Sequence, residues 1–163
     1  MTGPRVLVAG VGNVFLGDDG FGVEVVRRLA GRPVPPGVRV ADFGIRGLDL
    51  AYALLEPYDL VILVDACRRG GTPGTVYLLE PEPSSAGAML EPHGMIPTRA
   101  LRMAQEMGAT LGRLVVAGCE PESFGEPGIG RMGLSSPVAA AVAEAVRLVD
   151  TIVHQSVSLP ASS

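Results

Sequence analysis

The sequence predicts an α/β fold in which helices cover both faces of a mainly parallel sheet, and one edge strand runs antiparallel to its neighbour. Two observations lead to this prediction. Strand-like and helix-like segments alternate along the chain, and the strongest strand-like segments are continuous apolar runs. Such alternation is typical of parallel sheets whose two faces are both buried.

The N-terminal half contains three predicted strands and two predicted helices. Arg5–Gly10 is apolar enough for a buried strand, and Asp19–Ala30 places its apolar residues on one face of a helix. Val38–Asp42 is a short strand after a proline-rich turn, and Leu48–Leu55 is a short helix that ends before a proline. Leu60–Asp65 is a continuous apolar run, which predicts a central strand.

The C-terminal half begins with a short connection. Gly74–Leu79 has strand character, but it follows the central strand too closely for a helical crossover, which needs about a dozen residues. It is therefore expected at the edge of the sheet. Thr98–Met107 is a predicted helix, and Leu114–Gly118 is a predicted strand. Ser136–Val153 is a long amphipathic helix, with one of the two serines before Pro137 as its N-cap.

Length and composition exclude several classes of protein. The 163 residues predict a single domain over residues 1–155, with a mobile loop at Pro81–Leu90 and a disordered tail at 156–163. The net charge of −4, without a basic cluster, argues against nucleic-acid binding. No apolar run reaches the ~18 residues that a membrane span needs. Cys67 and Cys119 are expected to be small buried residues in a cytoplasmic protein.

The most informative segment is Gly10–Gly22, which reads G-V-G-N-V-F-L-G-D-D-G-F-G and directly follows the first strand. It does not match the dinucleotide-binding fingerprint, because Phe15 stands where the third glycine is required. The glycines are expected to serve tight turns and close helix–strand packing. Asp18 is expected to cap the following helix. Asp19 is expected to point into the crevice at the carboxyl ends of the strands, where open α/β sheets bind ligands.

Two further residues complete a candidate metal site. Asp65 ends the central strand, and His93 lies in a loop between a proline and a glycine. With Asp19 they supply two carboxylates and one imidazole, a mixed set that suits borderline divalent metals such as nickel, zinc, manganese or iron. Spacing along the chain does not show that the three converge. Glu120 follows another strand and is expected either to line the same crevice or to lie in a solvated loop.

At these residues the chain resembles the maturation endopeptidases of nickel–iron (NiFe) hydrogenases. Members of that family remove a C-terminal extension from the hydrogenase large subunit after nickel has been inserted. The resemblance extends over nearly the whole chain, although the turn D-F-G-I-R-G departs from the D-G-G-T often found in the family and indicates a different subgroup. The matching segments are Gly10–Gly22, Asp42–Gly47, Val64–Ala66, Pro92-His93, Gly118–Pro121 and Gly133–Val138.

The resemblance implies a three-layer α/β/α sandwich around a twisted, mainly parallel sheet. It implies metal contacts at Asp19, Asp65 and His93, with the nickel supplied by the substrate and no tightly bound resident metal. The partner is then a hydrogenase large-subunit precursor. Hydrolysis would use a water polarised by that nickel, or a general base at Asp19 or Asp42. The residues expected to bind substrate are Gly44, Arg46 and Glu120.

Two other functions remain open at this stage. One is a non-cleaving, nickel-dependent binding or chaperone module of the same fold. The other is a nucleotide-binding oxidoreductase, which the incomplete glycine fingerprint and the acidic loop oppose. The sequence contains neither G-x-S-x-G nor H-E-x-x-H, so a serine hydrolase of the nucleophile-elbow type and a zincin are not expected.

Overall fold

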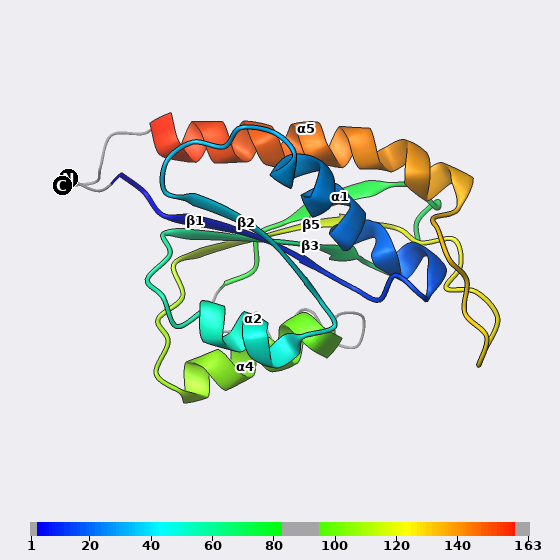
Figure 1. Cartoon of the computed structure of the whole chain (residues 1–163), viewed down its shortest axis with the longest axis horizontal. Coiled ribbons are helices and arrows are strands. Elements are labelled where there is room, and N and C mark those ends of the chain that lie inside the picture. Colours follow the sequence, from blue (N-terminus) through cyan, green and yellow to red (C-terminus); the bar gives the residue numbers. More distant parts are fainter. Residues whose placement is uncertain (1–2, 83–94, 159–163) are drawn as a thin grey trace.

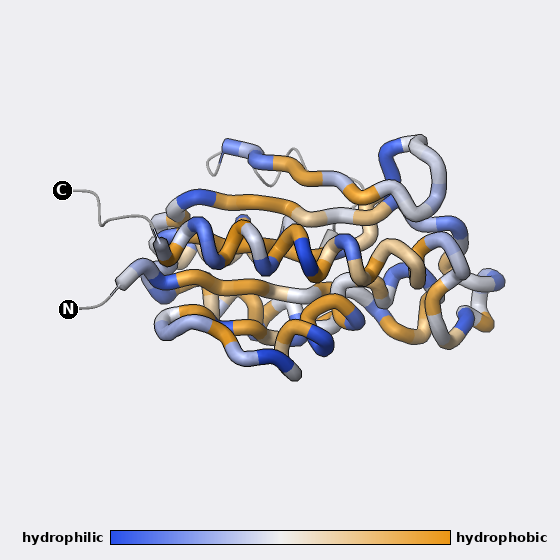
Figure 2. Tube along the Cα trace, turned by 90° about the horizontal axis from the view of Figure 1, so that it is seen from above, coloured by the Kyte–Doolittle hydropathy of each residue, from blue (hydrophilic) through white to orange (hydrophobic). Residues whose placement is uncertain are grey.

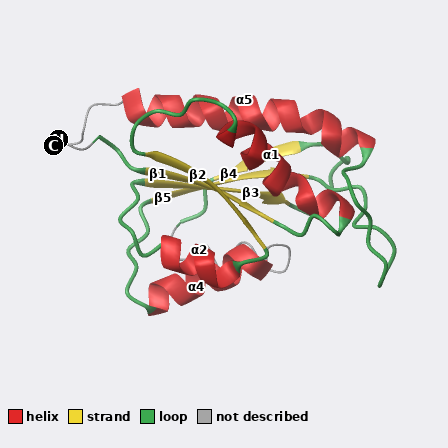
Figure 3. Ribbon diagram, viewed as in Figure 1, coloured by secondary structure: helices red, strands yellow, loops and turns green. Residues whose placement is uncertain are grey.

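The fold is built on one five-stranded sheet with the strand order β2-β1-β3-β5-β4. The computed structural model describes residues 3–82 and 95–158 (Figure 1). The sheet lies between two layers of helices, as the ribbon in Figure 3 shows. The strands are β1 (Val6–Val11), β2 (Val38–Gly44), β3 (Leu60–Ala66), β4 (Val76–Leu79) and β5 (Arg113–Cys119).

The strand pairing confirms the predicted sheet. β1 pairs in parallel with β2 and with β3, and β3 pairs in parallel with β5. β4 pairs with β5 in the antiparallel direction and forms one edge. Every residue of β1 and of β3 is buried, which explains why these strands are continuous apolar runs.

In the described part of the chain, four α-helices cover the sheet, two on each face (Figure 1). Helices α1 (Phe21–Ala30) and α5 (Ser136–Ser158) pack together on one face, and α2 (Gly47–Ala53) and α4 (Met95–Glu106) on the other. Each pair closes its own apolar core against the sheet. Figure 2 looks down onto the layer that contains α5, where hydrophilic and hydrophobic residues alternate along the helix. The three-layer sandwich is therefore confirmed.

Several helix boundaries differ from the prediction, and two of the differences change how a neighbouring segment is described. A short 3₁₀ helix, η1 (Gly17–Gly20), precedes α1, so the α-helix begins at Phe21 and not at Asp19. At the other end, α5 continues to Ser158, so the first three residues of the expected disordered tail are helical. Residues 159–163 and most of the loop expected to be mobile, 83–90, lie outside the described residues. No helix in the described part of the chain is long and apolar enough to cross a membrane.

Close packing of α1 against the sheet requires glycine at position 22. A Cβ atom there would lie 2.0 Å from the carbonyl oxygen of Val64 in β3. The helix therefore approaches the sheet backbone more closely than any other residue would allow. As a result, the loop between β1 and α1 is held against the carboxyl ends of the parallel strands, where the candidate site lies.

Candidate active site

Gly12 marks the point where the first loop, η1 and the end of β3 meet. Its φ of +136° is rare for residues with a side chain. A Cβ atom at Gly12 would lie 1.9 Å from the carbonyl oxygen of Asp19 and 3.6 Å from Oδ1 of Asp65. The glycine therefore lets the backbone pass between the two predicted metal-binding residues, and the structure places both of them at the same edge of the sheet.

Asp19 and Asp65 form an electrostatically coupled pair. Asp65 is 7% exposed, and its Oδ1 accepts a hydrogen bond from its neighbour's backbone, Ala66 N, at 2.8 Å. Burial raises the pKa of Asp65 well above its ordinary value, and the nearby charge of Asp19 raises it further. Burial also raises the pKa of Asp19, although its hydrogen bond from Asn13 N opposes this effect. Two carboxylates with this environment resist ionising together, and a divalent cation would stabilise both.

Asp42 lies at the end of β2, where the sheet is irregular. Gly10 of β1 pairs with Asp42, but the next residue, Val11, pairs with Gly44, so Phe43 is an extra residue in β2. Such bulges redirect side chains and are common beside active sites. The Asp42 carboxylate contacts Arg27 of α1, with 3.5 Å between Oδ2 and Nε. Asp42 therefore carries a half-buried carboxyl group beside a positive charge.

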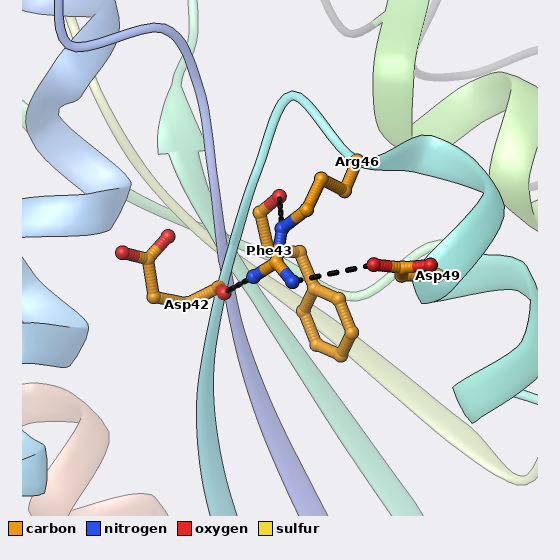
Figure 4. A network of polar contacts seen from close by, with 4 residues as sticks. All are labelled: Asp42, Phe43, Arg46 and Asp49. Carbon is orange, nitrogen blue, oxygen red and sulfur yellow. Dashed lines mark hydrogen bonds and ion pairs between the residues drawn. The ribbon is translucent and has the colours of Figure 1, made fainter.

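Arg46 holds the turn that follows Asp42 (Figure 4). Its guanidinium group donates to the carbonyl oxygen of Phe43 at 3.2 Å and to that of Asp42, and it pairs with Asp49 of α2 at 3.2 Å. Figure 4 shows the Asp42 carboxyl group on the opposite side of the strand from this network. Arg46 therefore fixes the backbone that carries Asp42 and leaves the carboxyl group free of the turn.

A cleft of about 310 Å³ opens beside these residues. Three predicted site residues line it, namely Asp42, Gly44 and Arg46. Gly12 and Asn13 also line the cleft, and they connect it to the acidic pair because Asn13 N binds Asp19. The cleft and the pair are thus neighbouring parts of one edge of the sheet. The remaining lining residues are Val14, Phe15, Val23, Arg27, Phe43 and Ile45.

Two predicted site residues are not placed beside this cleft. His93 lies outside the described residues, so its role as a metal ligand stays a prediction. In the parts of the chain that the structure does describe, no group of three or more His, Cys, Asp or Glu residues is arranged to hold a metal ion. Glu120 is only 5% exposed, and its Oε1 accepts hydrogen bonds from Arg69 N, Gly71 N and Tyr77 Oη. This corrects the expectation that Glu120 faces the crevice or lies in a solvated loop, because its carboxylate is held by the backbone of the exposed turn between β3 and β4.

The predicted capping role of Asp18 is wrong. Neither η1 nor α1 has a side-chain cap, and Asp18 is completely buried. Its carboxylate accepts hydrogen bonds from Glu122 N, Ser123 N, Ser135 N and Ser135 Oγ. Burial by itself would raise the pKa of Asp18, but these hydrogen bonds lower it below its ordinary value. Asp18 therefore ties the glycine-rich loop to segments more than a hundred residues away in sequence.

Arg27 is the site residue that sequence reasoning missed. It lies on the solvent side of an amphipathic helix, where an arginine carries no signal of its own. The signal was topological: α1 connects β1 to β2 by a parallel crossover, and such a helix packs close to the second strand. The two cysteines behave as predicted. Both are buried and unpaired, and burial raises the pKa of each thiol to about 12, so neither is a reactive thiolate.

Comparison with known proteins finds relatives that match most of this chain. The family model described as hydrogenase maturation protease matches residues 23–152. The hydrogenase expression/formation protein HupD of Rhodobacter capsulatus is 37% identical over 88% of this chain and 70% of its own length. The hydrogenase 2 maturation protease of Escherichia coli is 30% identical over 93% of this chain and 92% of its own.

Solved structures show the same likeness in three dimensions. The hydrogenase-maturating endopeptidase HybD from Escherichia coli superposes with a TM-score of 0.79, with 29% identity over 93% of each chain. A hydrogenase 2 maturation peptidase from a Thaumarchaeota archaeon superposes with a TM-score of 0.70 and is 35% identical, over 92% of this chain and 98% of its own. Because the family model spans most of the sequence and the relatives match over nearly its whole length, this chain belongs to the hydrogenase maturation proteases, a family of peptidases.

Proposed function

We propose that this protease removes the C-terminal extension of a nickel–iron hydrogenase large-subunit precursor after the precursor has received nickel. The relatives are maturation proteases of hydrogenases, which supports the choice of partner. The observation that carries the nickel requirement is the coupled pair of Asp19 and Asp65 beside the cleft of Asp42. The buried, unpaired cysteines are in keeping with a reaction in the cytoplasm.

The acidic pair provides a physical reason for nickel dependence. A precursor without nickel would have to approach two carboxyl groups that repel each other when ionised. A precursor with nickel presents a cation that both carboxylates can contact. Burial raises the pKa of both carboxyl groups and so favours their protonated forms, and binding of the cation would release such a proton. The sequence resemblance adds His93 as the third contact. Because this metal belongs to the substrate, we expect the purified protease to hold no stoichiometric metal of its own.

Asp42 is the better candidate for the general base. Its side chain is 35% exposed and lines the cleft, whereas Asp19 is coupled to Asp65 and accepts a hydrogen bond from Asn13. In the proposed reaction Asp42 accepts a proton from water as the hydroxyl adds to the scissile carbonyl carbon. The carbon–nitrogen bond then breaks, and the departing amine takes up the proton from Asp42.

The separate roles of Asp42 as general base and Asp19 as nickel contact can be tested with three variants. The assay uses the nickel-loaded precursor and measures both binding and the rate of cleavage. Asp42→Asn should bind the precursor as wild type does but cleave it at least about a hundredfold more slowly, because general bases typically contribute 10²–10⁴-fold. Asp19→Asn should weaken binding of the nickel-loaded precursor. Glu106→Gln, an exposed change at the end of α4 and outside the cleft, is the control and should leave both quantities unchanged. Equal cleavage by Asp42→Asn and wild type would exclude Asp42 as the base.

A further inference from the structure

We propose that four exposed apolar side chains beside the cleft form the surface on which the folded body of the precursor docks. We call them the docking ridge, and they are Phe15, Leu16, Ile129 and Met132. This inference rests on the proposed function, because it names the surface by which that substrate is held. The ridge joins two segments far apart in sequence, the loop after β1 and the loop before α5.

The ridge is unusual in its exposure. Phe15 is 65% exposed, Ile129 is 78% exposed and Met132 is 68% exposed, while Leu16 is 39% exposed. Single exposed apolar residues are common on protein surfaces, but a group of large ones marks an interaction site. Aromatic residues and methionine are also the types enriched in protein interfaces.

The backbone holds the two loops of the ridge together. Arg131 N donates to Phe15 O at 2.9 Å, and Gly17 N donates to Arg131 O at 2.7 Å. The loop that carries Ile129 is closed by a hydrogen bond of 2.8 Å from Gly130 N to Glu126 O. The apolar side chains are therefore presented by paired backbone and not by free loops, which reduces the entropy lost when a partner binds.

Asp18 binds the backbone at the start of the loop that carries Ile129 and Met132. Its carboxylate binds Glu122 N and Ser123 N at 2.8 and 3.1 Å, and its own N–H donates to Ser123 O at 3.0 Å. These contacts join the base of the second loop to η1, just behind Leu16. A fully buried carboxylate thus positions the loop before α5, whose outer residues are apolar and exposed. This supports a role for that loop in recognition.

The ridge is continuous with the candidate active site. Phe15 belongs to the ridge and also lines the cleft of Asp42. A second hollow of about 190 Å³ shares Val14 and Arg27 with that cleft and is lined by Met132. A polypeptide whose C-terminal segment enters the cleft at Asp42 can therefore contact the ridge at the same time. The geometry favours the substrate as the occupant, because a second copy of this chain on the ridge would cover Phe15 and obstruct the cleft.

The test is direct binding of the nickel-loaded large-subunit precursor from the same cell. All proteins carry Asp42→Asn so that the precursor is not consumed. Ile129→Ser and Met132→Ser should each raise Kd by about tenfold or more, as expected for interface positions that contribute strongly. Met107→Ser is the matched control and should leave Kd unchanged. Met107 is also exposed, at 43%, but it follows α4 and lies near the amino ends of the strands, away from the site.

Three outcomes separate this inference from the proposed function. If the ridge variants bind the precursor as tightly as the Met107→Ser control, the ridge does not hold the substrate. If sedimentation shows a dimer that Ile129→Ser and Met132→Ser dissociate without a change in Kd, the ridge joins two copies of this chain and the inference is overturned. If wild type binds the precursor through the ridge but does not cleave it, the inference stands and the proposed function fails. Equal thermal melting of all variants will show that the exposed substitutions leave the fold intact.

Discussion

Asp18 and Ser135 lie 117 residues apart and are joined by two hydrogen bonds of 2.7 Å, one from Ser135 N to Oδ1 and one from Ser135 Oγ to Oδ2. Ser135 immediately precedes α5, so this contact attaches the longest helix to the loop after β1. The adjacent residue, Asp19, belongs to the acidic pair of the site. Two neighbouring carboxylates therefore have different functions: Asp18 holds the scaffold, and Asp19 faces the candidate site.

Replacing Asp18 should destabilise the protein strongly. In Asp18→Asn an amide nitrogen would face N–H and O–H donors, so we expect the free energy of unfolding to fall by about 3 kcal/mol at neutral pH. Denaturation with guanidinium measures this change. Asp49→Asn, an exposed change, is the control and should lie within about 0.5 kcal/mol of wild type. An Asp18→Asn protein as stable as wild type would contradict the anchoring role.

The stabilisation by Asp18 should also depend on pH. Its pKa is lower in the folded protein than in the unfolded chain, because the hydrogen bonds outweigh the effect of burial. The contribution is therefore complete above the pKa of an unfolded aspartate, about 4, and is lost as the pH falls through the folded pKa. The difference in unfolding free energy between wild type and Asp18→Asn should shrink between about pH 5 and pH 2. A difference independent of pH would show that the charge of Asp18 is not involved.

Asp65 should behave in the opposite way to Asp18. Burial and the charge of Asp19 raise its pKa, so ionised Asp65 costs stability, and this cost grows as the pH rises from the unfolded to the folded pKa. Asp65→Asn keeps an oxygen that can accept from Ala66 N, so we expect no loss of unfolding free energy at pH 8. We expect cleavage of the nickel-loaded precursor to fall at least about a hundredfold, because a ligand to its metal is lost. Loss of stability with normal cleavage would make Asp65 a structural residue.

Arg46 should be needed for its shape as well as its charge. Its planar group serves two carbonyl oxygens and the Asp49 carboxylate, which a lysine cannot match. Arg46→Lys should therefore lower kcat/KM for the precursor by about tenfold through loss of the Asp42 backbone geometry. Asp49→Asn removes only the exposed ion pair and should change kcat/KM by less than about twofold. Full activity in Arg46→Lys would show that this network does not position Asp42.

The cysteines should be dispensable for catalysis. Cys67 and Cys119 are buried, and burial raises the pKa of each thiol to about 12. Treatment of the native protein with iodoacetamide at pH 7.5 should leave both thiols unmodified and the rate of cleavage unchanged, as mass spectrometry and the processing assay will show. Rapid alkylation with loss of activity would point to a thiol mechanism that the structure does not support.

The sequence predicted the parts of this molecule that depend on local pattern. Continuous apolar runs identified the buried strands, and the short link after Asp65 identified the antiparallel edge. The position of Asp19 and Asp65 at one edge of the sheet followed from the rule that parallel strands end at one edge, but their close approach is known only from the structure. His93 stays a prediction, because it lies outside the described residues.

The features that could not be predicted depend on contacts between distant segments. Nothing local distinguishes Asp18, which has partners more than a hundred residues away, from a helix cap. The prediction that Glu120 lies at the end of a strand was correct. Its hydrogen-bond partners could not be predicted, because Arg69 and Gly71 lie in the turn between β3 and β4, and Tyr77 lies in β4 at the edge of the sheet. The bulge at Phe43 is likewise a property of register and has no sequence signal of its own.

The most direct test of the central claim is to compare one precursor in two states. The protease is incubated with the large-subunit precursor loaded with nickel and with the same precursor lacking nickel, and the products are weighed by mass spectrometry. We predict loss of a C-terminal segment from the loaded form only, because the metal is the group that Asp19 and Asp65 contact. Equal cleavage of both forms would contradict nickel recognition by this acidic pair.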